Sequence, residues 1–115
     1  ARTLYLVPGF GLGVEWGNDG TVSGCGCYSE GSKYGTWQLY RPDGSIEALY
    51  TYGVAGMLQG WSFTTHANGV MLWCGDHVNG ARHGTWREWS ENAELVRECE
   101  YAQGRVVSER VWNRR

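Results

Sequence analysis

Cysteine, histidine and acidic side chains are the residues of this 115-residue chain that could support chemistry. The four cysteines are Cys25, Cys27, Cys74 and Cys99. A structural zinc site ordinarily uses C-x₂-C pairs, whereas Cys25 and Cys27 are separated by a single residue and no second pair follows. Four cysteines allow three disulfide pairings, among which the sequence does not decide. We therefore expect structural or free thiols, and no bound metal.

The three histidines are expected to have no catalytic or ligand role. His66, His77 and His83 have no ligand spacing with the cysteines. His77 stands where the other expected strands carry tyrosine, which predicts a core-facing ring with its polar tip near water. No serine lies in a nucleophile-elbow motif. The sequence therefore predicts a protein that is not an enzyme, with no catalytic residue and no cofactor.

Glutamates gather late in the chain, at Glu88, Glu91, Glu94, Glu98 and Glu100. Paired carboxylates hydrolyse glycosides only when they are held at a defined separation across a cleft. Two other interpretations stay open: a solvated face, or an acidic docking surface that speeds the capture of a basic partner. Four arginines between residues 105 and 115 follow at once and could neutralise this charge.

Regularly spaced turns indicate the elements that would position these side chains. Asp19-Gly20, Asp43-Gly44, Asn68-Gly69 and Asn92-Ala93 follow one another at intervals of 24, 25 and 24 residues. Asp-Gly and Asn-Gly favour two-residue type I′ hairpin turns, in which both central residues have positive φ. Alanine disfavours positive φ, so we expect a different or a longer turn at Ala93.

Strands are expected on both sides of each turn. Residues 35–44 (GTWQLYRPDG) form an aromatic strand that is closed by a turn, and Trp37 and Trp86 of this repeated pattern are expected in the core. Residues 46, 48, 50 and 52 are apolar and share one face of the returning strand. G-x-x-x-G connectors at residues 31–35, 56–60 and 80–84 join the units. No 3.6-residue apolar period is sustained between residues 11 and 104, so the sequence predicts an all-β fold.

This pattern resembles the MORN repeat, in particular its bacterial variant, in which a tyrosine and a glycine precede a G-x-aromatic strand and an Asn-Gly or Asp-Gly turn. Residues 28–44 and 77–89 match best, and the similarity covers about residues 11–104. The resemblance implies a single domain over residues 1–115, an elongated, twisted antiparallel sheet of about four β-hairpin repeats. Caps are expected at about residues 1–10 and 105–115.

The resemblance also implies a function, because repeat sheets present an extended binding surface. Stand-alone bacterial proteins that resemble this variant are often antitoxin or immunity components, which implies steric occlusion of a cognate toxin. A MORN-type scaffold or dimerisation module, including a homodimer, is the alternative. Off-pattern aromatic residues and the late glutamates are the partner-binding candidates: Trp61, Trp73, His77, Glu88, Trp89, Glu91, Glu94, Glu98 and Trp112.

Composition argues against other classes of partner. The formal net charge of −2 is unlike that of a nucleic-acid-binding module or a polybasic membrane binder. No apolar run approaches the roughly 20 residues that a membrane helix needs. The sequence leaves two compartments open, the bacterial cytoplasm and the periplasm, and the start at Ala1 rather than Met together with four cysteines favours the periplasm.

Overall fold

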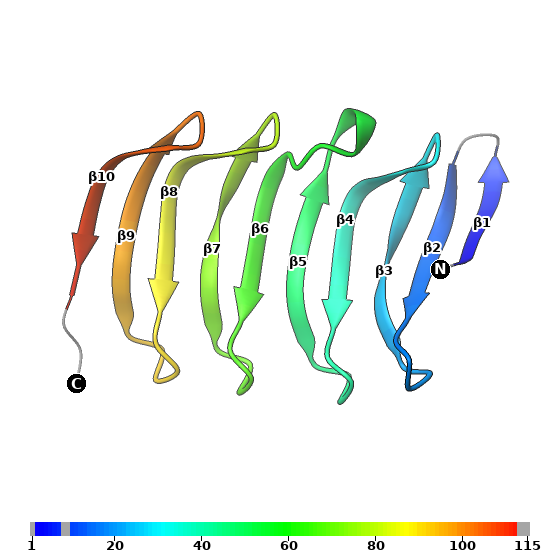
Figure 1. Cartoon of the computed structure of the whole chain (residues 1–115), viewed down its shortest axis with the longest axis horizontal. Helices are drawn as coiled ribbons and strands as arrows, with labels where there is room; N and C mark the ends of the chain where they lie inside the picture. The colour runs from blue at the N-terminus through cyan, green and yellow to red at the C-terminus, as the bar shows by residue number, and fades with distance from the viewer. Residues whose placement is uncertain (1, 8–9, 113–115) are drawn as a thin grey trace.

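The structure is a computed structural model that describes residues 2–7 and 10–112. In it, the chain forms one antiparallel sheet (Figure 1). The ten strands lie side by side in chain order, with β1 and β10 at the two edges. The sheet is open and extended, about 49 × 33 × 17 Å. The predicted all-β class and the elongated antiparallel sheet are confirmed. The strands are β1 (Arg2–Val7), β2 (Phe10–Trp16), β3 (Val22–Ser29), β4 (Ser32–Tyr40), β5 (Ile46–Tyr52), β6 (Gly60–Thr65), β7 (Met71–Val78), β8 (Ala81–Trp89), β9 (Leu95–Ala102) and β10 (Arg105–Val111).

Among the described residues, helical structure is confined to a short 3₁₀ turn, η1 (Val54–Gly56), between β5 and β6. No described segment forms a helix of the length and apolar character needed to cross a membrane.

The turns at the lower end of the sheet in Figure 1 are not the predicted type I′ turns. In the first, Gly20 N–H donates to Gly17 O over 3.1 Å, and Gly17 N–H donates to Thr21 O over 2.9 Å. Gly20 has a φ of 85°, but Asp19 does not have a positive φ. Its carboxylate instead accepts a hydrogen bond from Thr21 N–H at 3.0 Å. This acceptor stabilises a longer loop that needs only one left-handed residue.

Ala93 occupies the same position in the last of these turns, which is a longer loop as expected, but the other three turns share that loop and Ala93 does adopt a positive φ, so the expectation that it would be an exception was wrong. Its φ is 65°, and its N–H donates to Ser90 O over 2.9 Å as in the other three turns. Ser90 Oγ accepts the hydrogen bond from Asn92 N–H at 3.2 Å. A serine side chain thus supports the loop that an aspartate or asparagine supports elsewhere.

Two-residue turns occur at the opposite end of the sheet, beginning one residue before a predicted connector and ending on its first glycine. Glu30 and Gly31 both have positive φ, 51° and 83°, and Ser29 pairs with Ser32 across them. The second glycine of the connector, Gly35 (φ 72°), lies inside β4, where the register with β3 shifts. A bulge of this kind needs a left-handed residue, which glycine adopts without strain. The G-x-x-x-G spacing therefore joins a tight turn to a bulge, and β4 begins three residues before the predicted start.

The core is organised around two tryptophans, as predicted. Trp37 is fully buried and Trp86 is 4% exposed. The Trp37 indole N–H donates to Cys27 O at 2.8 Å, and the Trp86 indole N–H donates to Asp76 O at 3.0 Å. A Cβ atom added to Gly26 would overlap the Trp37 ring, and a Cβ atom added to Gly75 would overlap the Trp86 ring. Each tryptophan thus packs flat on a glycine of the neighbouring strand, 49 residues from its counterpart.

Candidate binding surface

The structure does not gather the predicted partner-binding residues into one patch. Because side chains alternate along a strand, the register separates them. Trp73, His77 and Glu88 share the face of Trp86, which we call the tryptophan face. Trp61 pairs with Asp76, and Glu98 with Arg87, on the opposite face. The other candidates lie beyond these positions: Trp89 at the end of β8, Glu91 and Glu94 in the following turn, and Trp112 after β10.

Two of the predicted acidic residues are already paired with arginines. Glu88 accepts from Arg97 Nε at 3.1 Å, and Glu98 accepts from Arg87 Nε at 2.9 Å. Arg97 also pairs with Glu109 at 3.3 Å. Because cross-strand pairs of opposite charge stabilise the sheet itself, these carboxylates contribute less to an acidic docking surface than their number suggests.

The predicted aromatic residues differ in how well a partner could reach them. Trp73 is half-buried beneath the guanidinium groups of Arg82 and Arg97, at 5.4 and 4.7 Å from the ring centre. His77 is 7% exposed and meets Trp86 edge-on, with ring centres 5.0 Å apart. Burial, followed by the positive charge of Arg82, lowers the pKa of His77 from its ordinary 6.5. Trp61 alone of these three is open to solvent, at 46%.

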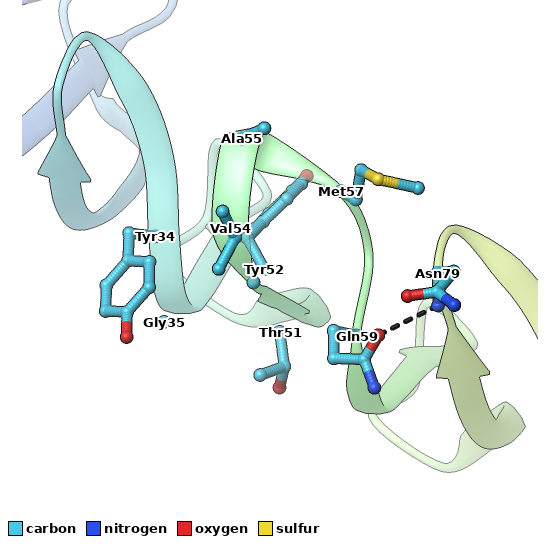
Figure 2. Close-up of a pocket in the computed structure, with 10 residues that line it drawn as sticks. Tyr34, Gly35, Thr51, Tyr52, Val54, Ala55, Met57, Gln59 and Asn79 are labelled. Carbon is cyan, nitrogen blue, oxygen red and sulfur yellow. Dashed lines mark hydrogen bonds between the residues drawn. The ribbon is translucent and has the colours of Figure 1, made fainter.

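A pocket that the sequence analysis missed lies at the end of the sheet that carries η1 (Figure 2). Its volume is about 670 Å³. Figure 2 shows side chains from the first half of the sheet on one side and Gln59 and Asn79 on the other, with Gln59 Oε1 accepting from Asn79 N–H at 2.8 Å. The lining includes Tyr34, Thr51, Tyr52, Val54, Met57, Gln59 and Asn79.

The pocket lies beside the connector between β5 and β6, where regular strand pairing is short but backbone contact continues, with Gln59 N–H donating to Thr51 O at 2.8 Å. The register of these two strands is limited to Ala48↔Thr64 and Leu49↔Phe63, the shortest of any neighbouring pair in the sheet, with one further bridge from Tyr52 to Leu58. The connector is longer than the two-residue turns beside it and folds back on itself, with Gly53 N–H donating to Met57 O at 2.7 Å.

The lining offers apolar surface and neutral hydrogen-bonding groups but no charged side chain. Val54 is 84% exposed, and Met57 and Tyr34 are also open to solvent. Trp61 borders this region, since its carbonyl accepts from the Thr51 hydroxyl at 2.8 Å. Such a surface can accept apolar or aromatic side chains of a partner, and it provides no acid–base pair.

A signal for this pocket was present in the sequence. The equivalent connectors read Glu30-Gly31-Ser32 and Asn79-Gly80-Ala81, whereas residues 54–58 read VAGML. Apolar residues in this solvent-facing connector depart from the polar character of the others, and exposed apolar clusters are the kind of surface at which interaction sites are sought.

The described residues contain no group of three histidine, cysteine or acidic side chains placed to hold a metal. All four cysteines are free thiols in this structure.

Comparison of the chain with protein-family models, with characterised proteins and with solved structures found no match. The similarity to the MORN repeat thus stays a prediction from the sequence motifs.

Proposed function

We propose that this protein is a binding module that captures a partner protein at the pocket between β5 and β6. One observation carries the proposal: exposed apolar side chains, Val54, Met57 and Tyr34, surround a hollow of about 670 Å³ beside the connector between β5 and β6. Exposed apolar residues scattered singly need no explanation, but a cluster around a concavity is typical of a protein-interaction site.

We propose, following the sequence resemblance, that the partner is a cognate toxin and that this protein acts as its immunity or antitoxin protein. Inhibition would be steric. The neutral lining favours contact over chemical modification of the partner. A sheet about 49 Å by 33 Å offers more area than the roughly 800 Å² that each partner buries in a standard interface.

Binding of the purified protein to the product of the neighbouring gene tests this proposal. In isothermal titration calorimetry we expect Val54→Asp to weaken the complex about tenfold or more, because a charge would enter an apolar contact. Val54 is 84% exposed in the unbound protein, so its folding should be unaffected.

Val107→Asp is the matched control, since Val107 is also exposed, at 68%, but lies on β10. Equal weakening by both substitutions would contradict the proposed site. The absence of any complex with the neighbouring product would contradict the toxin partner. A stable homodimer in sedimentation that Val54→Asp dissociates would favour the dimerisation module instead.

A further inference from the structure

A second hollow lies on the tryptophan face and shares no lining residue with the pocket at η1. It has a volume of about 100 Å³, and its walls include Ser62, Thr64, Trp73, His77, Arg82 and Trp86. Each of these residues has an equivalent 49 positions earlier in the chain, with the same strand pairing, around Trp37.

Lys33 and Arg82 are equivalent cations on this face. Lys33 pairs with Tyr28 in the β3–β4 register, and Arg82 pairs with His77 in the β7–β8 register. The Lys33 ammonium lies 4.6 Å from the ring centre of Trp37, and the Arg82 guanidinium lies 4.3 Å from that of Trp86. Each cation therefore covers one buried tryptophan. We call the strands around Trp37 the first half of the sheet and those around Trp86 the second half.

The two cations differ in their counter-charge. Lys33 Nζ lies 3.6 Å from the carboxylate of Glu15. The position equivalent to Glu15 is Thr64, which pairs with Trp73 as Glu15 pairs with Gly24. No carboxylate among the described residues lies within 4 Å of Arg82, whose Nη1 donates to Tyr101 Oη at 3.1 Å.

Thr64 leaves a polar atom unsatisfied beside Arg82. Its hydroxyl is buried and has no hydrogen-bond partner in the structure. Buried polar atoms are almost always paired, so an unpaired one at the wall of a hollow indicates a missing ligand or solvent atom. A hydroxyl donor and a guanidinium directed at one small volume suit an acceptor with negative charge.

The hollow lies where the imidazole ring of His77 replaces the larger phenol ring of Tyr28. In the first half, the Tyr28 ring fills the space above Gly13, where a Cβ would overlap it. In the second half the corresponding residues are His77 and Ser62, whose Nδ1 and Oγ lie 3.4 Å apart.

We infer that this hollow binds a carboxylate, the side chain of an aspartate or glutamate of a partner protein, beside Arg82. A volume of about 100 Å³ admits a carboxylate but no aromatic ring. Charge-assisted hydrogen bonds to Arg82, with the Thr64 hydroxyl as a further donor, supply the recognition. The inference does not rest on the proposed function, because it concerns a separate hollow and its test uses small probes.

The test titrates the protein with N-acetyl-glutamate amide, N-acetyl-glutamine amide and acetate, and follows backbone amides by ¹H–¹⁵N NMR. We expect saturable shifts at Thr64, His77 and Arg82 with the glutamate probe and none with the neutral glutamine probe. Equal responses to these two probes, or no saturable response to the glutamate probe, would overturn the inference. Saturation by acetate without any by the glutamate probe would overturn the assignment to a protein side chain.

Two substitutions of Thr64 separate the site from general effects. Thr64→Glu places the carboxylate of the first half beside Arg82, and we expect it to abolish probe binding. Thr64→Val removes the hydroxyl and should weaken the glutamate probe about tenfold. Thr36→Glu, on exposed β4 surface, is the control and should leave binding unchanged. Probe binding by folded Thr64→Glu at the affinity of the unsubstituted protein would contradict the site. If Thr64→Glu does not fold, unchanged affinity in Thr64→Val would contradict it.

Discussion

The surroundings of Trp37 and those of Trp86 share one geometry and differ in what fills it. Tyr28 meets Trp37 edge-on with ring centres 5.1 Å apart at 78°, and His77 meets Trp86 at 5.0 Å and 79°. Both tryptophans lie on a glycine and beneath a cation. The parts that hold the sheet together are thus constant. The residues that surround the two tryptophans differ. Of the two sites, the one around Trp86 has a hollow and a buried histidine, His77, and the one around Trp37 has a tyrosine in that position.

Removing either tryptophan should break the sheet most strongly. We expect Trp37→Ala and Trp86→Ala each to lower the free energy of unfolding by about 3–5 kcal/mol, the usual cost of deleting a buried large aromatic side chain. Urea denaturation followed by circular dichroism measures this loss. Trp61→Ala, at a side chain 46% exposed, is the control and should cost much less. A similar loss at Trp61 would show that burial does not determine these costs.

Exchanging the residues that differ between the halves sharpens the comparison. His77→Tyr alone should lower the free energy of unfolding by about 1–3 kcal/mol, because the larger ring would overlap Ser62 where the first half has Gly13. The double substitution His77→Tyr with Ser62→Gly reproduces the first half and should recover much of that loss. Urea midpoints of the single and double variants give the coupling energy, expected to be about 0.5–3 kcal/mol. Strict additivity would mean that the two positions do not compensate in volume.

The histidine should also make the second half sensitive to acid. Burial lowers the folded-state pKa of His77 below the ordinary 6.5 that applies in the unfolded chain. The unfolded state therefore binds a proton first, so stability is full above about pH 6.5 and is lost as the pH falls below it. Each unit of lowering corresponds to about 1.4 kcal/mol. Urea unfolding at pH 7.5 and 5.5 should show a smaller decrease for His77→Gln than for the unsubstituted protein. Equal decreases would exclude His77 as the source.

The ion pair of the first half should contribute least. Glu15 and Lys33 are each about 30% exposed in their side chains, so Glu15→Gln should lower the free energy of unfolding by less than about 1 kcal/mol. The difference should shrink in high salt, because the pair is partly screened. Urea midpoints at low and high ionic strength give the comparison, and a loss that does not change with salt would indicate a packing effect.

Much of the fold could be predicted because the turn residues recur every 24 or 25 residues and because Trp37 and Trp86 occupy the same position within their repeats. The turn types could not, since Asp19-Gly20 and Glu30-Gly31 both place glycine second. The decision between them depends on the Asp19 carboxylate accepting from the Thr21 backbone. The spacing of Cys25 and Cys27 is explained by Gly26 beneath Trp37, a contact between strands that no local pattern indicates.

The candidate sites were harder to predict, because bulges shift the register in nearly every strand pair. Without that register, the partners of Glu88 and Glu98 cannot be read from the sequence. The pocket at η1 depends on how the connector between β5 and β6 folds back on itself, which a repeat pattern does not reveal. Trp61 was singled out for its departure from the repeat, whereas the apolar connector beside it, which lines the pocket, was not.

The short register between β5 and β6 has a consequence for how the chain unfolds. Regular strand pairing across this line is limited to two residue pairs and one bridge, and side-chain hydrogen bonds from Arg41, Thr51 and Thr65 supplement it, whereas each half keeps its own buried tryptophan. Cooperativity between the halves is therefore weakest here, and partial opening along this line should need less free energy than global unfolding. The pocket at η1 draws its lining from both sides of the line. A partner held there would join the two units, so binding would raise the cooperativity of the whole sheet as well as occupy its surface.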